Sequence, residues 1–179
     1  MERIGLFYGS DTGCTEAIVE KIKAYFEENI LECHDMSGIK NTEQFLNYNH
    51  IILGVPTWYD GDLQSDWDNF FETFKSIDFT GKTVAIFGLG DQVGYSEYFV
   101  DGIGTLGHTV LENGGNLIGA WSTEGYYHDE SIATFEHEGT LYFMGLALDE
   151  DNQKDLTEER LSEWLQDITA EFNILHNYA

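Results

Sequence analysis

Glycine and hydroxyl residues follow an apolar run near the N-terminus and form the clearest candidate for a ligand site in the chain. The run Ile4–Tyr8 leads into residues 9–15, Gly-Ser-Asp-Thr-Gly-Cys-Thr, and apolar residues then recur at helical spacing. This pattern predicts a strand, a tight loop and a helix that begins near Gly13. The first N–H groups of such a helix are unpaired and lie at the positive end of its dipole. The loop therefore suits a phosphate group.

This loop carries no positive charge, since neither Lys nor Arg occurs between Gly9 and Thr15. Backbone amides, the helix end and the hydroxyls of Ser10, Thr12 and Thr15 would hold a bound phosphate. The loop of nucleotide triphosphatases needs a wider glycine spacing, followed by Lys and then Ser or Thr. Here the glycines are four residues apart and no Lys follows, which argues against ATP and GTP. The alternative is an ordinary Gly/Ser turn between a strand and a helix.

Two later loops combine polar residues with large aromatic ones. Residues 57–62 follow the apolar run 50–55. Residues 89–95 begin where the apolar run 83–89 ends. If these strands and the first are neighbours in a parallel sheet, the three loops meet at its carboxyl edge. Trp58 and Tyr95 could then sandwich a flat ring. A phosphate site beside a planar ring describes flavin mononucleotide (FMN); an adenine nucleotide fits less well, and each aromatic could instead fold over the core.

Strand-length apolar runs alternate with amphipathic helices along the chain. The candidate strands are 4–8, 30–36, 50–55, 83–89 and 116–121, with 141–148 resuming the last one. Candidate helices follow Gly13, follow Asp62 and span about 96–112, and residues 41–48 form a short helix or a turn. The last candidate helix begins near Asp155, whose spacing to Glu158 resembles a capping box. This alternation predicts a doubly wound five-stranded parallel sheet in one α/β domain over 1–179, with residues 122–140 as an insertion.

The charge balance is strongly acidic: 33 acidic and 8 basic side chains give a formal net charge of −25. This charge argues against nucleic-acid binding, because a phosphate backbone would be repelled. It can steer basic protein partners toward the chain, although a solvated surface that maintains solubility is an equally ordinary reason for it.

Targeting signals and metal motifs are not apparent in the sequence. The N-terminus lacks a charged-then-apolar segment and the longest apolar runs are strand-sized, so we expect neither export nor membrane spanning. Cys14 and Cys33 form no Cys-x-x-Cys pair, and the six histidines fit no metal spacing. We therefore expect reduced thiols, no metal site and a cytoplasmic location.

Five segments together resemble one known family. They are Ser-Asp-Thr-Gly-Cys-Thr (10–15), Pro-Thr-Trp-Tyr-Asp-Gly (56–61), Gly-Asp-Gln-Val-Gly-Tyr (90–95), Trp-Ser-Thr-Glu-Gly-Tyr (121–126) and Leu-Ala-Leu-Asp-Glu-Asp-Asn-Gln (146–153). In this order, and over nearly the whole chain, they resemble the flavodoxins of the long-chain group. The resemblance implies a flavodoxin-like fold with strand order 2-1-3-4-5, an insertion in the fifth strand, and non-covalently bound FMN.

The resemblance also assigns roles to residues. It implies that the phosphate is bound by Ser10, Asp11, Thr12, Gly13, Cys14 and Thr15. It implies that Trp58 and Tyr95 stack on the two ring faces and that Asp151 reaches the ribityl chain. The ring would be lined by Thr57, Tyr59, Gly61, Gly90 and Asp91, with Pro56, Asp60, Leu89 and Tyr98 completing the candidate site.

Some positions differ from the family pattern. Cys14 is unusual in the phosphate loop, but its position chiefly contributes an amide. Leu89 stands where Thr is common, so one hydroxyl contact is expected to be absent. In the family, the peptide that here joins Tyr59 to Asp60 reorients on one-electron reduction, and Asp60 adopts unusual backbone angles less readily than Gly does.

By resemblance, the function is that of a low-potential one-electron carrier rather than an enzyme. The expected partners of this monomer are basic-surfaced redox proteins, such as a ferredoxin/flavodoxin–NADP reductase, and low-potential acceptors such as photosystem I components, nitrogenase or radical enzymes. An FMN-dependent NAD(P)H:quinone reductase is the enzyme alternative, but no basic cluster awaits a nicotinamide nucleotide. A phosphoacceptor receiver domain would need Asp at the end of the third strand, where Pro56 and Thr57 stand.

Overall fold

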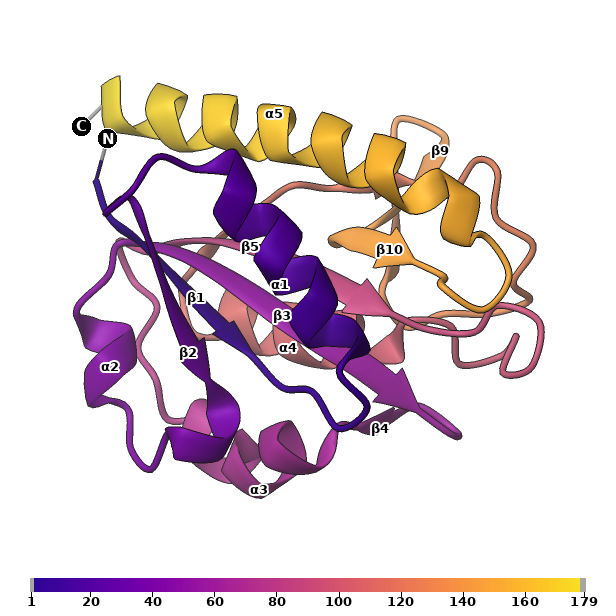
Figure 1. Cartoon of the computed structure of the whole chain (residues 1–179), viewed down its shortest axis with the longest axis horizontal. Coiled ribbons are helices and arrows are strands. Elements are labelled where there is room, and N and C mark those ends of the chain that lie inside the picture. The colour runs from indigo at the N-terminus through magenta and orange to yellow at the C-terminus, as the bar shows by residue number, and fades with distance from the viewer. Residues whose placement is uncertain (1, 178–179) are drawn as a thin grey trace.

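The computed structural model describes residues 2–177 and contains one large sheet with helices on both faces (Figure 1). Its parallel strands are β1 (Ile4–Tyr8), β2 (Leu31–Asp35), β3 (His50–Trp58), β5 (Thr83–Leu89), β6 (Asn116–Ile118) and β10 (Leu146–Leu148). They follow the order β2-β1-β3-β5, and both β6 and β10 pair with β5 on its outer edge. The predicted order 2-1-3-4-5 is therefore confirmed, with the fifth strand divided into β6 and β10.

In the described part of the chain, five helices cover the sheet. One face carries α1 (Cys14–Tyr25) and α5 (Thr157–Asn177), which runs along the top of Figure 1. The other face carries α2 (Glu43–Leu46), α3 (Ser65–Phe74) and α4 (Asp101–Glu112). Single 3-10 turns occur at Met36–Gly38 and Lys154–Leu156. Strands covered on both faces are expected to be continuously apolar, which is why the runs in the sequence lacked polar alternation.

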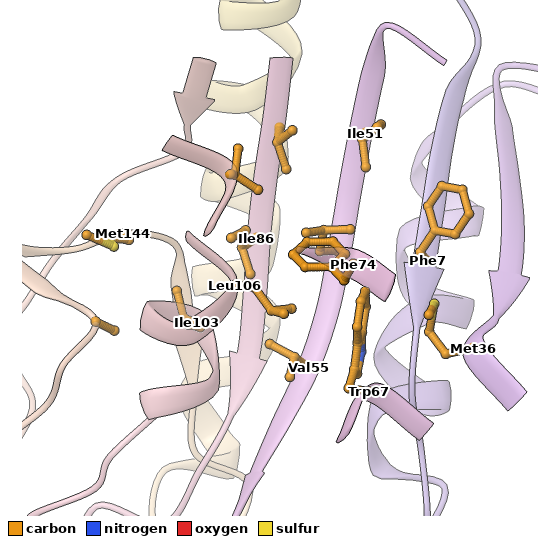
Figure 2. Close-up of a cluster of buried hydrophobic side chains, with 14 of the residues drawn as sticks. Phe7, Met36, Ile51, Val55, Trp67, Phe74, Ile86, Ile103, Leu106 and Met144 are labelled. Carbon is orange, nitrogen blue, oxygen red and sulfur yellow. The ribbon is translucent and has the colours of Figure 1, made fainter. Parts of the chain in front are cut away.

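The larger core cluster fills the space between the sheet and α3 and α4. Trp67 and Phe74 of α3 pack against strand residues such as Val55 and Ile86, and all four side chains are fully buried (Figure 2). The Trp67 indole N–H also donates to the carbonyl of Gly54, at 2.9 Å. This bond fixes α3 against the part of β3 that precedes Trp58.

The insertion differs from the sequence expectation in extent and structure. Trp121–Ser122 (β7), Thr134–His137 (β8) and Thr140–Phe143 (β9) form a separate antiparallel sheet in the order β7-β9-β8. The chain leaves the main sheet at Gly119, whose φ of 78° is accessible mainly to glycine, and returns only at Leu146. The predictions that 116–121 is one strand and that 141–148 resumes it are therefore wrong at residues 119–121 and 141–145.

Three predicted boundaries also need correction. The helix expected over 96–112 begins only at Asp101, because Val100 adopts a left-handed φ of 49° and its side chain is buried in the core. The strand expected to end at Pro56 continues to Trp58: β1 pairs with β3 only as far as Gly54, so the missing N–H of Pro56 leaves no β1 bond unmade. The last helix begins at Thr157, because the 3-10 turn precedes it.

A further property of the helices concerns membranes. Within residues 2–177, no helix is both long enough and apolar enough to cross a bilayer.

Candidate functional site

The carboxyl edge of the sheet contains a cavity formed by loops from four places in the sequence. They follow β1, β3, β5 and β10. The residues that line the cavity are Ser10, Asp11, Thr12, Cys14, Thr15, Pro56, Thr57, Trp58, Tyr59, Leu89, Gly90, Asp91, Tyr95, Tyr98, Glu150 and Asp151. The three loops expected to converge from the sequence do so, and the segment after β10 joins them.

The loop after β1 presents the beginning of α1 to the cavity. Gly13 precedes the helix with a left-handed φ of 87°, and its N–H donates to Ser10 Oγ at 3.1 Å. Among the residues that the structure describes, no side chain caps α1, so its first N–H groups keep their donor capacity. Thr12 and Thr15 line the same cavity. This arrangement provides oriented donors and hydroxyls without a cation.

The end of β3 and the turn that follows it present two aromatic residues, Trp58 and Tyr59. Thr57 and Trp58 pair with the short antiparallel strand β4 (Asp62–Leu63), which makes the segment a hairpin. Tyr59 at its tip has a left-handed φ of 44° and is 62% exposed. A positive φ costs a non-glycine residue of order 1–2 kcal/mol, so the surrounding contacts must maintain this conformation.

One of those contacts comes from α4. The hydroxyl of Thr57 accepts a hydrogen bond from the Gly102 N–H, at 2.8 Å, and so ties the hairpin to the first turn of that helix. Three aromatic rings of the cavity lining lie next to one another: the Trp58 and Tyr59 rings are 6.0 Å apart, and the Tyr59 and Tyr95 rings meet edge to face at 6.3 Å. Trp58 Nε1 is buried without a hydrogen-bond partner among the described residues. A ligand or water acceptor would satisfy this N–H.

The loop after β5 is organised by Asp91. Its Oδ1 accepts hydrogen bonds from the N–H of Gly94 at 2.7 Å, the N–H of Val93 at 3.0 Å and the amide of Asn152 at 2.8 Å. These hydrogen bonds hold the pKa of the Asp91 carboxyl below its usual range, and the bond from the Gly94 N–H has the largest effect. The Tyr95 N–H in turn donates to the Asp91 carbonyl. Asp91 thus positions the turn that carries Tyr95.

The segment after β10 is anchored by a second carboxylate, Asp149, which is 1% exposed. Its Oδ2 accepts from the backbone N–H and the side-chain amide of Gln92, and its Oδ1 from the N–H groups of Asp151 and Asn152. Asp149 therefore joins the loops after β5 and β10.

The wall of the cavity is acidic. Asp11, Asp91, Glu150 and Asp151 line it, and none of the lining residues in the described part of the chain is Lys, Arg or His. Loss of solvent, together with the charges of Asp91 and Asp149, raises the pKa of the Asp151 carboxyl. The geometry thus combines anion-binding donors, aromatic surfaces and fixed negative charge.

Most of the residues selected from the sequence line this one cavity. Gly13, Asp60 and Gly61 belong to the same loops but not to its wall. Glu150 was not selected, although it lies within the segment 146–153 that carried the resemblance. The individual ligand roles of all these residues stay predictions.

Comparisons with known proteins agree along the chain. The flavodoxin family profile matches residues 6–164. The flavodoxin of Buchnera aphidicola is 47% identical over 173 residues, covering 97% of this chain and 99% of that protein. The flavodoxin of Trichodesmium erythraeum is 47% identical over 176 residues, covering 97% of this chain and 100% of that one.

A solved structure agrees as well. The crystal structure of Fusobacterium nucleatum flavodoxin bound to flavin mononucleotide superimposes with a TM-score of 0.86 at 35% identity, covering 96% of this chain and 99% of that one. The chain therefore belongs to the flavodoxin family.

Proposed function

We propose that the cavity binds FMN non-covalently and that the chain is a low-potential one-electron carrier. The observation that carries this proposal is the combination in one cavity of an uncapped helix end without a cation and the aromatic side chains of Trp58 and Tyr95. The related Fusobacterium nucleatum flavodoxin, whose structure contains FMN, supports it.

The cavity fits FMN in each of its parts. The N-terminus of α1 and the hydroxyls of Ser10, Thr12 and Thr15 suit the phosphate, since backbone N–H groups at a helix end solvate an anion. Trp58 and Tyr95, which line the same cavity, offer aromatic faces for the ring. Asp151, from the segment after β10, suits the ribityl chain.

The flavin supplies the electron chemistry, and the protein adjusts its potential. Four carboxylates in the wall oppose any increase in negative charge inside the cavity. This field makes addition of a second electron unfavourable and so makes the fully reduced protein a strong donor.

As a carrier, the protein requires redox partners, and we assign these to basic-surfaced proteins. A net charge of −25 favours fast, salt-sensitive association with such surfaces. Electron-transfer complexes are typically small and short-lived. A ferredoxin/flavodoxin–NADP reductase in the cytoplasm is the expected donor or acceptor for a monomeric chain.

The enzyme alternative, an NAD(P)H:quinone reductase, requires direct reduction of the flavin by the nicotinamide nucleotide. Among the described residues that line the cavity, none is basic, so the wall offers no cationic partner for the phosphates of such a nucleotide. The test is rapid mixing of the FMN-loaded protein with NADPH, alone and with catalytic amounts of a ferredoxin/flavodoxin–NADP reductase. The carrier assignment predicts loss of flavin absorbance only with the reductase; fast bleaching by NADPH alone would establish the enzyme instead.

A further inference from the structure

The loop after β1, residues 9–15, contains an acidic residue that opposes its proposed role in binding a phosphate. Asp11 lies in the middle of the loop and lines the cavity, so the loop proposed to hold a phosphate itself contains a carboxylate. The repulsion between two like charges rises as their separation falls, so the position in which the Asp11 carboxylate is held affects phosphate binding. The loop therefore needs a device that fixes the Asp11 side chain.

That device is the side chain of Gln64, the residue that precedes α3. Gln64 is 0% exposed, and its carboxamide is fully engaged. Oε1 accepts from the Trp67 N–H at 3.2 Å and so caps α3, while Nε2 donates to Asp11 Oδ1 and to Asp66 Oδ2, both at 2.8 Å. Both amide hydrogens thus go to carboxylates from different segments.

A second donor reaches the same oxygen. Ser65 Oγ donates to Asp11 Oδ1 at 2.9 Å. The Asp11 carboxylate is therefore held against the first turn of α3 by two neutral donors, while the hydroxyls of Ser10 and Thr12 line the cavity.

The packing around Gly9 shows that the Gln64 side chain fits only because residue 9 has no side chain. A Cβ atom on residue 9 would overlap Oε1 of Gln64 and would approach the Trp67 ring to 2.9 Å. The absence of a side chain at Gly9 therefore lets the carboxamide lie directly beneath the loop. Gly9, Gln64 and Trp67 form one packed unit below the candidate phosphate site.

We propose that Gln64 is a positioning residue that determines the preference of the cavity for a phosphorylated flavin over an unphosphorylated one. It does so by holding the negative charge of Asp11 away from the phosphate. This inference rests on the proposed function. Replacing the carboxamide with an apolar group of similar size removes the Gln64 donor and leaves Ser65 Oγ as the remaining donor to Asp11 Oδ1. The Asp11 carboxylate is then held less firmly and can turn toward water on the cavity side.

The test compares FMN with riboflavin, which differ only in the phosphate. Gln64→Met is expected to lower the ratio of FMN to riboflavin affinity about tenfold, with riboflavin affinity changed by less than about threefold. The measurement is quenching of flavin fluorescence on titration with apoprotein. Inorganic phosphate added to the apoprotein should also raise Tm less in the variant than in the wild type.

Two backgrounds separate the charge of Asp11 from a general structural effect. Gln64 makes equivalent bonds to Asp11 and Asp66, but only Asp11 lines the cavity. In the Asp11→Asn background, Gln64→Met should change the affinity ratio by less than about twofold, whereas in the Asp66→Asn background the tenfold loss should persist. Equal losses for both flavins, or equal losses of the ratio in both backgrounds, would overturn the proposal.

An exposed variant guards against a failure of Gln64→Met to fold. Ser65→Ala removes the other donor to Asp11 Oδ1 without disturbing the core, and it should lower the ratio in the same direction by a smaller factor. An unchanged ratio in Ser65→Ala, with Gln64→Met unfolded, would count against the inference. Wild-type apoprotein that binds neither flavin would refute the proposed function itself, whereas wild-type preference for FMN with an unaltered ratio in the variants refutes only the role of Gln64.

Discussion

Neutralising one carboxylate of the cavity wall should raise the potential of the second reduction step by a predictable amount. Asp151 is the most suitable position, because it lines the cavity, is exposed, and uses its backbone N–H rather than its carboxylate in the bond to Asp149. Asp151→Asn therefore removes a charge and leaves the loop anchors in place.

The magnitude follows from Coulomb's law. A charge about 10 Å from the ring opposes an added electron by roughly 0.4 to 1.7 kcal/mol for effective dielectric constants of 80 to 20. Since 59 mV corresponds to a tenfold change for one electron, this is about 20 to 70 mV. The exposure of Asp151 places its effect near the lower end, at about 20 mV.

The assay is a redox titration of the FMN-loaded protein at about 0.01 M and about 1 M salt, where the screening lengths are about 30 Å and about 3 Å. Asp151→Asn should raise the second potential at low salt, and the shift should fall by more than half at high salt. Asp167→Asn on the exposed side of α5 removes the same charge outside the cavity wall and is the matched control. A shift equal to that of the control, or one that salt leaves unchanged, would refute the electrostatic reasoning.

Three further outcomes are expected. Trp58→Ala and Tyr95→Ala should each weaken the binding of both FMN and riboflavin about tenfold or more in flavin fluorescence titrations, since the lost contact is to the ring that both flavins share. A loss of affinity confined to FMN would contradict the stacking role. Bound FMN should protect the Cys14 thiol, which lines the cavity, from reaction with maleimide. Cys33 is an internal reference whose reaction with maleimide stays slow, because burial raises its pKa to about 11. Equal labelling of Cys14 with and without FMN, measured by mass spectrometry, would place the cofactor elsewhere. Burial raises the pKa of the Asp101 carboxyl, so the ionised side chain destabilises the folded protein at pH values above that pKa, and this cost disappears below the unfolded-state value near 3.9. Asp101→Asn should therefore make the apoprotein more stable to urea at pH 7 but not at about pH 3.5. A difference in stability that does not depend on pH would contradict this reasoning.

The parallel sheet and its helices could be predicted from sequence because each apolar run reports burial on both faces. The run 50–55, for example, contains no polar alternation, and all its residues are buried in β3. The carboxyl-end rule then predicted which loops converge, and residues from all three line one cavity.

The boundaries that failed depend on tertiary contacts. Residues 96–100 have helical spacing, yet Phe99 and Val100 are drawn into the core and Val100 adopts a positive φ that ends the pattern. Leu141 and Phe143 resemble a strand of the main sheet, but they pair with β7 and β8 instead. Local sequence gives no signal for the choice between two partners.

The supporting polar residues were also beyond sequence reasoning. Gln64 stands between the short strand β4 and α3, at an otherwise ordinary helix start, and only its burial beneath Gly9 identifies it. Asp149 belongs to an acidic segment in which a buried carboxylate cannot be distinguished from exposed ones. Glu150 lies in the same acidic segment. The signal that could have identified it was its position within residues 146–153, which resemble the family.

The most direct test of the central claim, that this cavity holds FMN through an uncharged loop and aromatic walls, is a fluorescence titration of wild-type apoprotein with FMN and with riboflavin. We predict complete quenching of FMN at one flavin per chain, and clearly weaker binding of riboflavin. No quenching, or equal affinity for the two flavins, would contradict the account.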